Sequence, residues 1–480
     1  MLIEDLYRPP WHERMVQVIS NMIDSTMSEN DILQLELEEW EKSPVRESMI
    51  VGERYYRNKT DILTKKQEIK WKSNQKLPHG FAKKLVDQKV GYLLAKEPTF
   101  ATENEKYAEI LNDTFDRGLL KKIKNIGKEA INKGIAYLYP YINESGGLSF
   151  QKFPSEQILP FWGDNEHLVI TAFLRIYSQT IYKQGRKETQ KKVEYYHSGG
   201  VKFFVFENGK LIPDVPAGIE QNYHFLVNDK PYVWEKIPLI HFKYNEEEQP
   251  LVDSIKALVD NYNLQSSTNA DNLADIPKFI YKLVNYGGQD LGEFISDMNK
   301  YMAIKLDENG DVGKLQADIV TEAVEKEIDR TRNAIYEFGR GVDTRDVNLR
   351  DASGLALRFR FADLDMDCNT LETEFQSSIE HMLWFINHYL LLTGQGDYTE
   401  EVVNVIFNRN IIIAETEAID NCEKSVGILD DKTIRENHPW YTEEVESRLE
   451  EQAENRQKEI DEYTAMLSKN QTREDLEDEE

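Results

Sequence analysis

The feature that most constrains the fold is a long helical pattern in the last third of the chain. Apolar residues recur every three or four positions from Leu357 to Tyr389, which is the spacing of one face of an α-helix. A helix from Ser353 to about Leu391 would be about 60 Å long, at about 1.5 Å per residue. Because helices in globular domains are usually much shorter, we expect this helix to connect separate regions of the chain.

Two shorter helical patterns precede it, at residues 253–274 and 321–338. The first has one stripe of residues at helical spacing, Ile255, Val259, Tyr262, Ser266, Ala270 and Leu273. Between the helices, apolar runs at 279–284 and 303–306 flank a short helical pattern at 291–301, which predicts a strand–helix–strand insert. The segment from Gly310 to Lys314 resembles an incomplete P-loop, but its spacing is too short and Leu315 replaces the required Ser or Thr, so it predicts a turn.

The spacing of apolar residues divides the remaining segments into helical and strand regions. The first 130 residues are mainly helical in pattern. Residues 135–245 contain short alternating runs joined by Gly-Gly and Asn-Gly pairs, which favour antiparallel hairpins because primed turns need positive φ. A strand at 402–413 and helices at 415–427, 432–437 and 443–467 follow the long helix. The expected fold class is α+β, mainly α.

Charge is large and unevenly distributed. The chain has 480 residues, with 58 Lys and Arg against 86 Asp and Glu, for a net charge of −28. A surface this acidic argues against a protein that coats nucleic acid, because phosphate binding needs positive faces. Residues 441–480 hold fifteen acidic and five basic residues, and the last thirteen, 468–480, are expected to be a disordered acidic tail.

A basic run at residues 53–96 opposes this trend, with twelve Lys and Arg against four Asp and Glu. Aromatic residues are interleaved with its lysines, as they often are in nucleic-acid grooves. The alternative, which the overall charge favours, is a helical face that packs on acidic neighbours, including those of another copy.

Motifs for catalysis are absent. The sequence has no G-x-S-x-G and no H-E-x-x-H, its nine histidines are scattered, and its two cysteines, Cys368 and Cys422, can form neither a disulfide scaffold nor a Cys-based zinc module. Asp363, Asp365 and Asp367 could hold a hard metal ion, but a solvated acidic face is the favoured interpretation. We predict no enzyme activity, no cofactor and no metal site. No signal peptide or membrane segment is visible, which favours an intracellular protein.

Four stretches of the chain carry a recognisable pattern: Ala352-Ser-Gly-Leu-Ala-Leu-Arg-Phe with Asp363-Leu-Asp365, and residues 77–95, 237–260 and 427–433. They resemble the portal proteins of tailed bacteriophages, in the branch from siphophages and prophages of Gram-positive hosts, and the first stretch is the best match. In the last stretch the family often has Ser where Asp430 stands. The stretches occur in the family's order over most of the chain.

The resemblance implies a portal fold with named regions. These are a wing at 1–248, a first stem helix at 249–275, a clip at 276–315, a second stem helix at 316–340, a tunnel loop at 341–352, the long helix and a return strand at 353–414, and a crown at 415–467.

The resemblance also implies a function and partners. The chain would form a ring, usually of twelve subunits, at one vertex of the capsid. Double-stranded viral DNA would enter and leave through it. Its expected partners are the terminase large subunit, the major capsid and scaffolding proteins and a head-completion adaptor, with no membrane. An acidic channel would let DNA slide, because tight phosphate contacts would hold it. Another head or neck protein, such as an adaptor, is the alternative, and a metal-dependent nuclease using the three aspartates is a remote one.

Two sets of site residues follow from the same resemblance. The tunnel loop would present Asp343, Arg345, Asp346, Asn348 and Arg350 to DNA, with Gly339, Gly341 and Gly354 as hinges. For Arg345 and Arg350, salt bridges to Asp343, Asp346 or Asp351 between subunits are the alternative. The clip would bind partners through Tyr286, Gln289, Glu293, Asp297 and Lys300.

Overall fold

The computed structural model describes residues 28–67, 72–183, 185–227, 229–275, 280–284, 309–315, 321–345, 354–409, 415–442, 445–458 and 460–461, with single positions at 290, 292, 296 and 300. The chain forms two compact units. The first comprises the residues up to Asp343 together with Ala362–Asn410, and the second comprises Thr344–Phe361 together with the residues from Ile411 onwards. Among the described residues, none of the helices is both long and apolar enough to cross a bilayer.

The described part of the first unit begins with helices whose starts are set by capping side chains. Ser28 caps the first described helix and exchanges hydrogen bonds with Asp31, while Ser43 precedes Pro44 at the start of the next. Asp116 caps the last of the group. The helices are α3 (Glu29–Glu41), α4 (Pro44–Tyr56), the 3-10 turn η2 (Asp61–Thr64), α5 (Phe81–Leu93), α6 (Glu105–Thr114) and α7 (Arg117–Lys133). The predicted helical N-terminal region is confirmed for the described residues.

The strands of this unit form antiparallel sheets, as the hairpin signals predict. One sheet has the order β12-β2-β3, and a larger one has the order β4-β5-β6-β7-β8 with β9 beside β7. Two small pairs, β1-β15 and β10-β11, also belong to this unit, as does the β13-β14 pair described below. The strands are β1 (Thr99–Ala101), β2 (Ile135–Ile142), β3 (Leu148–Phe153), β4 (Ile158–Trp162), β5 (Ile170–Lys183), β6 (Arg186–His197), β7 (Gly200–Glu207), β8 (Lys210–Pro213), β9 (Glu220–Gln221), β10 (Phe225–Val227), β11 (Lys230–Tyr232), β12 (Ile240–Lys243) and β15 (Asn404–Ile406).

A continuous apolar core joins the helices to both larger sheets. Helix α3 contributes Leu37 and Trp40, which are 0% and 1% exposed, and these pack with Phe173 of β5 and Phe153 of β3. The alternation of apolar and polar residues along the strands places one face of each sheet in this core. The core therefore holds the sheets and the first helices together as one body.

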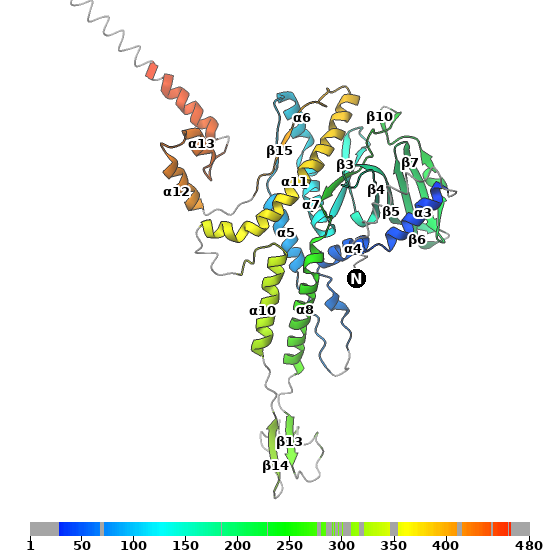
Figure 1. Ribbon diagram of the computed structural model, residues 1–480, viewed down its shortest axis with the longest axis vertical. Coiled ribbons are helices and arrows are strands. Elements are labelled where there is room, and N and C mark those ends of the chain that lie inside the picture. The colour runs from blue at the N-terminus through cyan, green and yellow to red at the C-terminus, as the bar shows by residue number, and fades with distance from the viewer. Residues whose placement is uncertain are drawn as a thin grey trace, which may run out of the picture. The chain divides into compact units, whose positions relative to one another are not determined.

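Two helices, α8 (Leu251–Asp275) and α10 (Thr321–Phe338), pack side by side (Figure 1). The chain between them includes an antiparallel hairpin of β13 (Ile280–Val284) and β14 (Asp311–Leu315). Both helices confirm the prediction. The turn predicted at Gly310–Lys314 is wrong, because most of it is strand β14, whose pairing partner could not be read from local pattern. Residues 303–306 lie outside the described part.

The second half of helix α8 is held by polar contacts to the extended segment at residues 72–80, here called the strap. Alternate backbone N–H groups of the strap donate to α8 side chains at 2.6–3.0 Å: Ser73 to Asp275, Gln75 to Asp271, Leu77 to Ser267 and His79 to Asn263. The two spacings match, since four helical residues rise about 6 Å and two extended residues about 6.6 Å. The predicted stripe is therefore wrong in the second half of the helix, at Ser266, Ala270 and Leu273. Of these, Leu273 is 54% exposed.

The long helix α11 runs from Gly354 to Leu392, over 39 residues, which confirms the prediction within one residue at each end. Its part in the first unit packs through Phe375 on Phe242 of β12 and through a hydrogen bond between Asn387 and Tyr107 of α6. The return strand is shorter than predicted, since the described strand β15 covers only Asn404–Ile406. In the second unit, α12 (Glu415–Ser425), α13 (Asp431–Glu436) and the helical residues 445–458 follow.

One glycine lets α4 approach α7 closely. A Cβ atom at Gly52 would lie 1.8 Å from the backbone oxygen of Asn132, whereas a Cβ at Gly91 of α5 would meet nothing within 4 Å. We predict that Gly52→Ala lowers the free energy of unfolding by about 2 kcal/mol or more, because backbone must move to admit the methyl group.

The matched control is Gly91→Ala, which we expect to be neutral or to stabilise by about 0.5–1 kcal/mol through helix propensity. Urea titrations followed by circular dichroism measure both variants. Equal midpoints for the two would contradict the close packing of α4 on α7.

Candidate functional site

The end of α10 meets the long helix at a buried ion pair, and we call this region the junction. Lys89 of α5 is fully buried, with its Nζ 2.6 Å from Oδ2 of Asp367 in α11. The hydroxyl of Tyr244, which directly follows β12, donates to the same oxygen at 2.7 Å. Three parts of the first unit therefore converge on one carboxylate.

The same lysine also fixes the end of α10. Its ammonium donates to the backbone oxygen of Arg340 at 3.1 Å, and the Arg340 guanidinium lies 3.6 Å from the second oxygen of Asp367. Because a buried charge without a partner is costly, each of these groups restricts where the others can lie. The junction therefore fixes the end of α10 relative to α5 and α11.

Burial dominates the electrostatics of the junction. It lowers the pKa of Lys89, against the opposing effect of Asp367. It raises the pKa of Tyr244, with a further contribution from Asp367. It also raises the pKa of the Cys368 thiol to about 12, so this buried cysteine is not a nucleophile at neutral pH.

The chain that leaves α10 is bound to α5 rather than free. Gln88 donates to the backbone oxygen of Val342 at 3.2 Å and accepts from its N–H at 2.9 Å. A Cβ at Gly339 would lie 2.6 Å from Leu85 Cδ1, and one at Gly341 would lie 2.2 Å from Leu85 Cδ2. These two glycines allow close packing against α5, and their role as hinge residues stays a prediction.

The tunnel-loop residues fall into two groups. Asp343 accepts two hydrogen bonds from the guanidinium of Arg332 in α10, at 2.6 and 2.8 Å, so it anchors the start of the loop. Arg345 is exposed. Asp346, Asn348 and Arg350 lie outside the described residues.

The clip residues are less fully described. Lys300 is exposed, and it lies in the predicted helix at 291–301, of which the described positions are helical. Tyr286, Gln289, Glu293 and Asp297 lie outside the described part.

The three aspartates of α11 do not form a shared site. Asp367 belongs to the junction, whereas Asp365 is bound by the guanidinium of Arg409 and by the hydroxyl of Tyr92 at 3.0 Å. Asp363 is exposed. The interpretation as a solvated acidic face is wrong for Asp367, which is buried against Lys89. The side chain of Asp365 pairs with Arg409 but stays 41% exposed. Within the described ranges, no three His, Cys, Asp or Glu residues are grouped so that they could hold a metal ion.

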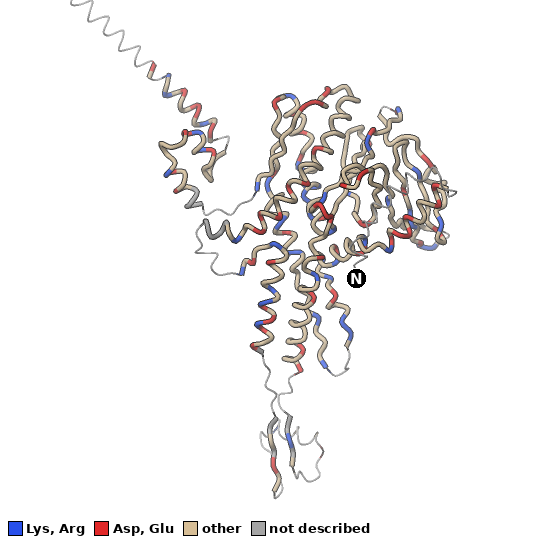
Figure 2. The backbone as a smooth tube through the Cα atoms, viewed as in Figure 1, with Lys and Arg blue, Asp and Glu red and all other residues tan. Residues whose placement is uncertain are grey.

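The basic run at 53–96 is partly used inside the first unit. Besides Lys89, Lys65 pairs with Asp271 of α8 at 2.9 Å and Arg54 pairs with Asp61 at 2.6 Å. Figure 2 shows Lys and Arg positions along the segment beside α8. These contacts favour packing on acidic neighbours as the role of those residues.

Three residues of this region, Lys89, Tyr244 and Arg332, are not singled out as site residues by the sequence patterns. A signal for Lys89 does exist, because it lies four residues after Leu85 and four before Leu93, inside the apolar stripe of α5. A lysine on a buried helix face needs a partner. Tyr244 and Arg332 carry no comparable local signal.

We predict that Lys89→Met lowers the free energy of unfolding by about 3–5 kcal/mol, because it leaves Asp367 buried without its ammonium partner. Adding Asp367→Asn should recover at least half of that loss, since the amide oxygen can still accept from Tyr244. Urea titrations of the two single variants and the double variant give the coupling energy.

Lys326→Met is the matched control. Lys326 pairs with Glu322 at 2.7 Å on an exposed face of α10, where both side chains are at least 75% exposed. We expect a change below about 0.5 kcal/mol there. A loss at Lys89 no larger than at Lys326 would refute the structural role of the junction.

Comparisons with known proteins cover most of the chain. The phage portal protein family of the SPP1 Gp6-like type matches residues 45–463. The portal protein of Bacillus phage SPP1 is 30% identical over 428 residues, which cover 85% of this chain and 84% of that protein. The portal protein of Clostridium phage phiCD119 is 30% identical over 448 residues, which cover 87% of this chain and 95% of that protein.

A solved structure described as the neck of a native GTA particle computed with C12 symmetry covers 74% of this chain and 89% of that chain, with a TM-score of 0.40 and 11% identity. The family match and the two viral relatives confirm the resemblance noted in the sequence. The chain therefore belongs to the phage portal protein family, whose members are structural, non-enzymatic head–tail connector proteins of the virion's portal vertex.

Proposed function

We propose that the chain assembles into a closed ring of twelve subunits whose central channel passes double-stranded viral DNA during packaging and ejection. The observation that carries the proposal is the pair of α8 and α10, which leaves large apolar side chains uncovered. Leu264, Leu273 and Phe338 are 47%, 54% and 59% exposed. Contacts between unlike faces of identical subunits close into rings, and such contacts would cover these side chains.

The proposed regions follow the elements in chain order. Helices α8 and α10 are the stem, and the segment at 276–315, which includes the β13–β14 hairpin, is the clip. The elements at 1–248 are the wing, residues 415–467 are the crown, and α11 with β15 connects the stem to the crown. The end of the stem is supported by the junction, because Lys89 binds the backbone at Arg340.

The loop at 341–352 is proposed to face the DNA. Its first residues are bound to α5 and α10 through Val342 and Asp343, so its position in the ring is defined at that end. Arg345 and Arg350 would then contact phosphates transiently. The net charge of −28 keeps such contacts weak overall, because an acidic surface repels the duplex.

The clip is proposed to bind the terminase large subunit during packaging and a head-completion adaptor afterwards, through Tyr286, Gln289, Glu293, Asp297 and Lys300. A two-stranded hairpin is barely stable by itself in water, so neighbouring copies would have to support β13 and β14. The major capsid and scaffolding proteins are the proposed partners of the wing.

We predict that the purified protein forms rings with a central hole, visible by negative-stain electron microscopy. Leu264→Glu combined with Phe338→Glu should weaken the ring, because each carboxylate would be buried at a subunit contact. Sedimentation velocity across protein concentration and salt measures the change.

As a control, Leu226→Glu replaces a leucine of similar exposure, 43%, in the β10–β11 hairpin and should leave the ring intact. A wild-type protein that stays monomeric at all concentrations would overturn the proposal.

We predict that Arg345→Glu with Arg350→Glu leaves the ring intact but reduces the DNA packaged or retained in the head, because repulsion replaces transient phosphate contacts. Virion DNA content, measured by quantitative PCR, and ring formation, seen by electron microscopy, are the two readouts.

Arg186→Glu with Lys187→Glu, on the exposed tip of β6, is the matched charge reversal outside the proposed channel. Normal packaging by the loop variant would refute a DNA-facing loop. Loss of the ring would mean that these arginines are subunit contacts.

A further inference from the structure

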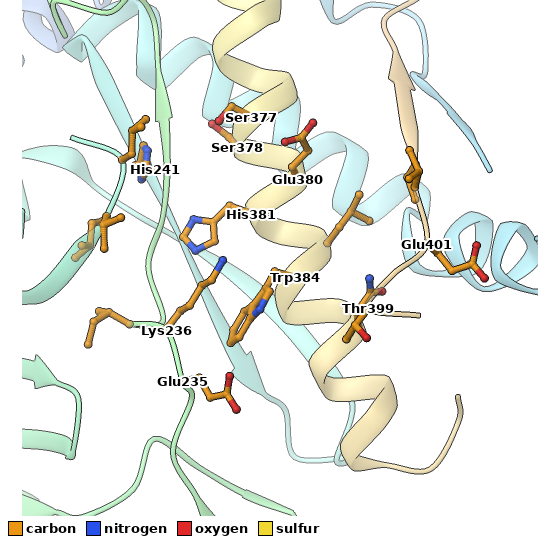
Figure 3. A pocket seen from close by; sticks show the side chains of 18 of the residues that line it. Glu235, Lys236, His241, Ser377, Ser378, Glu380, His381, Trp384, Thr399 and Glu401 are labelled. Carbon is orange, nitrogen blue, oxygen red and sulfur yellow. The ribbon is translucent and has the colours of Figure 1, made fainter. Parts of the chain in front are cut away.

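A cavity of about 1050 Å³ lies in the first unit, beside the part of α11 that follows the junction residue Asp367 in sequence (Figure 3). Its walls are α11 between Ser377 and Asn387, the start of β5 with the residues before it, the segment at 235–241 that leads into β12, and residues 399–403. This volume is at the upper end of the range of pockets that bind ligands, about 300–1,000 Å³. None of the cavity's residues takes part in the proposed stem, clip or tunnel loop.

One cation in the cavity lacks an anionic partner. Lys236 is exposed, and no hydrogen bond or ion pair from its ammonium is found within the described part of the chain. The ammonium lies 4.8 Å from the ring centroid of Trp384, a cation–π arrangement that holds it over the cavity wall. Figure 3 shows the Lys236 side chain directed toward His381.

A second polar group in the wall is buried and unpartnered. His241 is 8% exposed, and its Nδ1 atom is buried without a hydrogen-bond partner among the described residues. A buried polar atom in this state costs free energy unless another group satisfies it. Burial lowers the pKa of His241 to about 4, so at neutral pH the ring is uncharged and adds no positive charge to the cavity wall.

The carboxylates of the cavity do not satisfy these groups. In Figure 3, the carboxylates of Glu235, Glu380 and Glu401 are directed away from the Lys236 ammonium. Glu401 instead accepts a hydrogen bond from Asn104 at 2.8 Å. The anion that would complement Lys236 must therefore come from outside the cavity's own side chains.

The rim of the cavity is apolar and open to solvent. Leu168, Val169 and Val402 are 53%, 58% and 74% exposed, and all three line the cavity. Clustered exposed apolar side chains around a hollow are typical of a binding surface. The cavity thus combines an apolar rim with one cation that has no anionic partner among the described residues.

We propose that this cavity binds an extended segment of a partner protein in which an Asp or Glu lies between apolar residues. The carboxylate would pair with Lys236, while the flanking apolar side chains cover Leu168, Val169 and Val402. This pairing would give Lys236 an anionic partner, and it does not depend on the proposed channel or clip.

The test uses the full-length protein and two synthetic peptides, acetyl-Leu-Leu-Glu-Leu-Leu-amide and the same peptide with Gln in place of Glu. Isothermal titration calorimetry at pH 7 should show the Glu peptide binding at least tenfold more tightly than the Gln peptide. Lys236→Met should remove at least that tenfold difference, whereas Lys236→Arg should keep most of it. Because Lys236 is exposed, its substitution should not unfold the protein.

Lys230→Met is the matched control, since it removes an exposed lysine from β11 outside the cavity and should leave binding unchanged. Equal binding of both peptides, or a Glu preference that survives Lys236→Met, would overturn the proposal. The proposal would also be overturned if hexanoate displaced the Glu peptide as effectively as unlabelled Glu peptide does. The occupant would then be a small carboxylate and not a protein segment.

A last experiment tests whether a segment of this same chain, rather than a partner protein, occupies the cavity. Leu2-Ile-Glu-Asp-Leu-Tyr7 has two carboxylates between apolar residues. If Glu4→Gln with Asp5→Asn in the full chain tightens peptide binding tenfold or more, a segment of this chain is the occupant and a partner protein is not. Unchanged peptide binding by that variant supports the proposal.

Discussion

The buried ion pair between Lys89 and Asp367 is the interaction on which the arrangement of the first unit depends. It joins α5 to α11, and through Tyr244 and the backbone of Arg340 it also fixes the chain after β12 and the end of α10. A buried ion pair contributes little net stability compared with apolar side chains, but the loss of one partner is costly. Its effect is therefore to specify one alignment of these elements rather than to add stability.

A second set of polar contacts, from the strap, holds the C-terminal half of α8, at the end of the helix pair opposite the junction. The strap donates its alternate N–H groups to polar side chains four residues apart on α8, so backbone groups that would otherwise need water are satisfied inside the unit. Together, the junction and the strap leave the outer faces of α8 and α10 free for other contacts. The polar contacts thus lie within the subunit, while exposed apolar side chains on α8 and α10 remain for the proposed contacts between subunits.

The charge of the chain fits a protein that guides DNA without holding it. Several basic residues of the run at 53–96 form ion pairs with acidic residues of the same subunit, as Lys65 does with Asp271. Their positive charges are therefore neutralised within the fold. What remains is a strongly acidic subunit. Such a surface gives little counterion release on contact with phosphates, and so little friction against a moving duplex.

The sequence by itself determined the long helices, the hairpins of the larger sheets and the family. The bounds of α11, α8 and α10 follow from apolar spacing, and the hairpins follow from Gly-Gly and Asn-Gly turns, because both signals are local. The tertiary structure alone decided the partners of the polar residues. Asp367 and Asp365 look alike in the sequence, yet one is buried against Lys89 and the other is bound by Arg409. The residues that form these pairs are separated by 278 and 44 positions, and strand β14 likewise pairs across the clip segment. A local pattern records which residues are apolar and how they are spaced, whereas the partner of a buried charge depends on which distant segments the folded chain brings together.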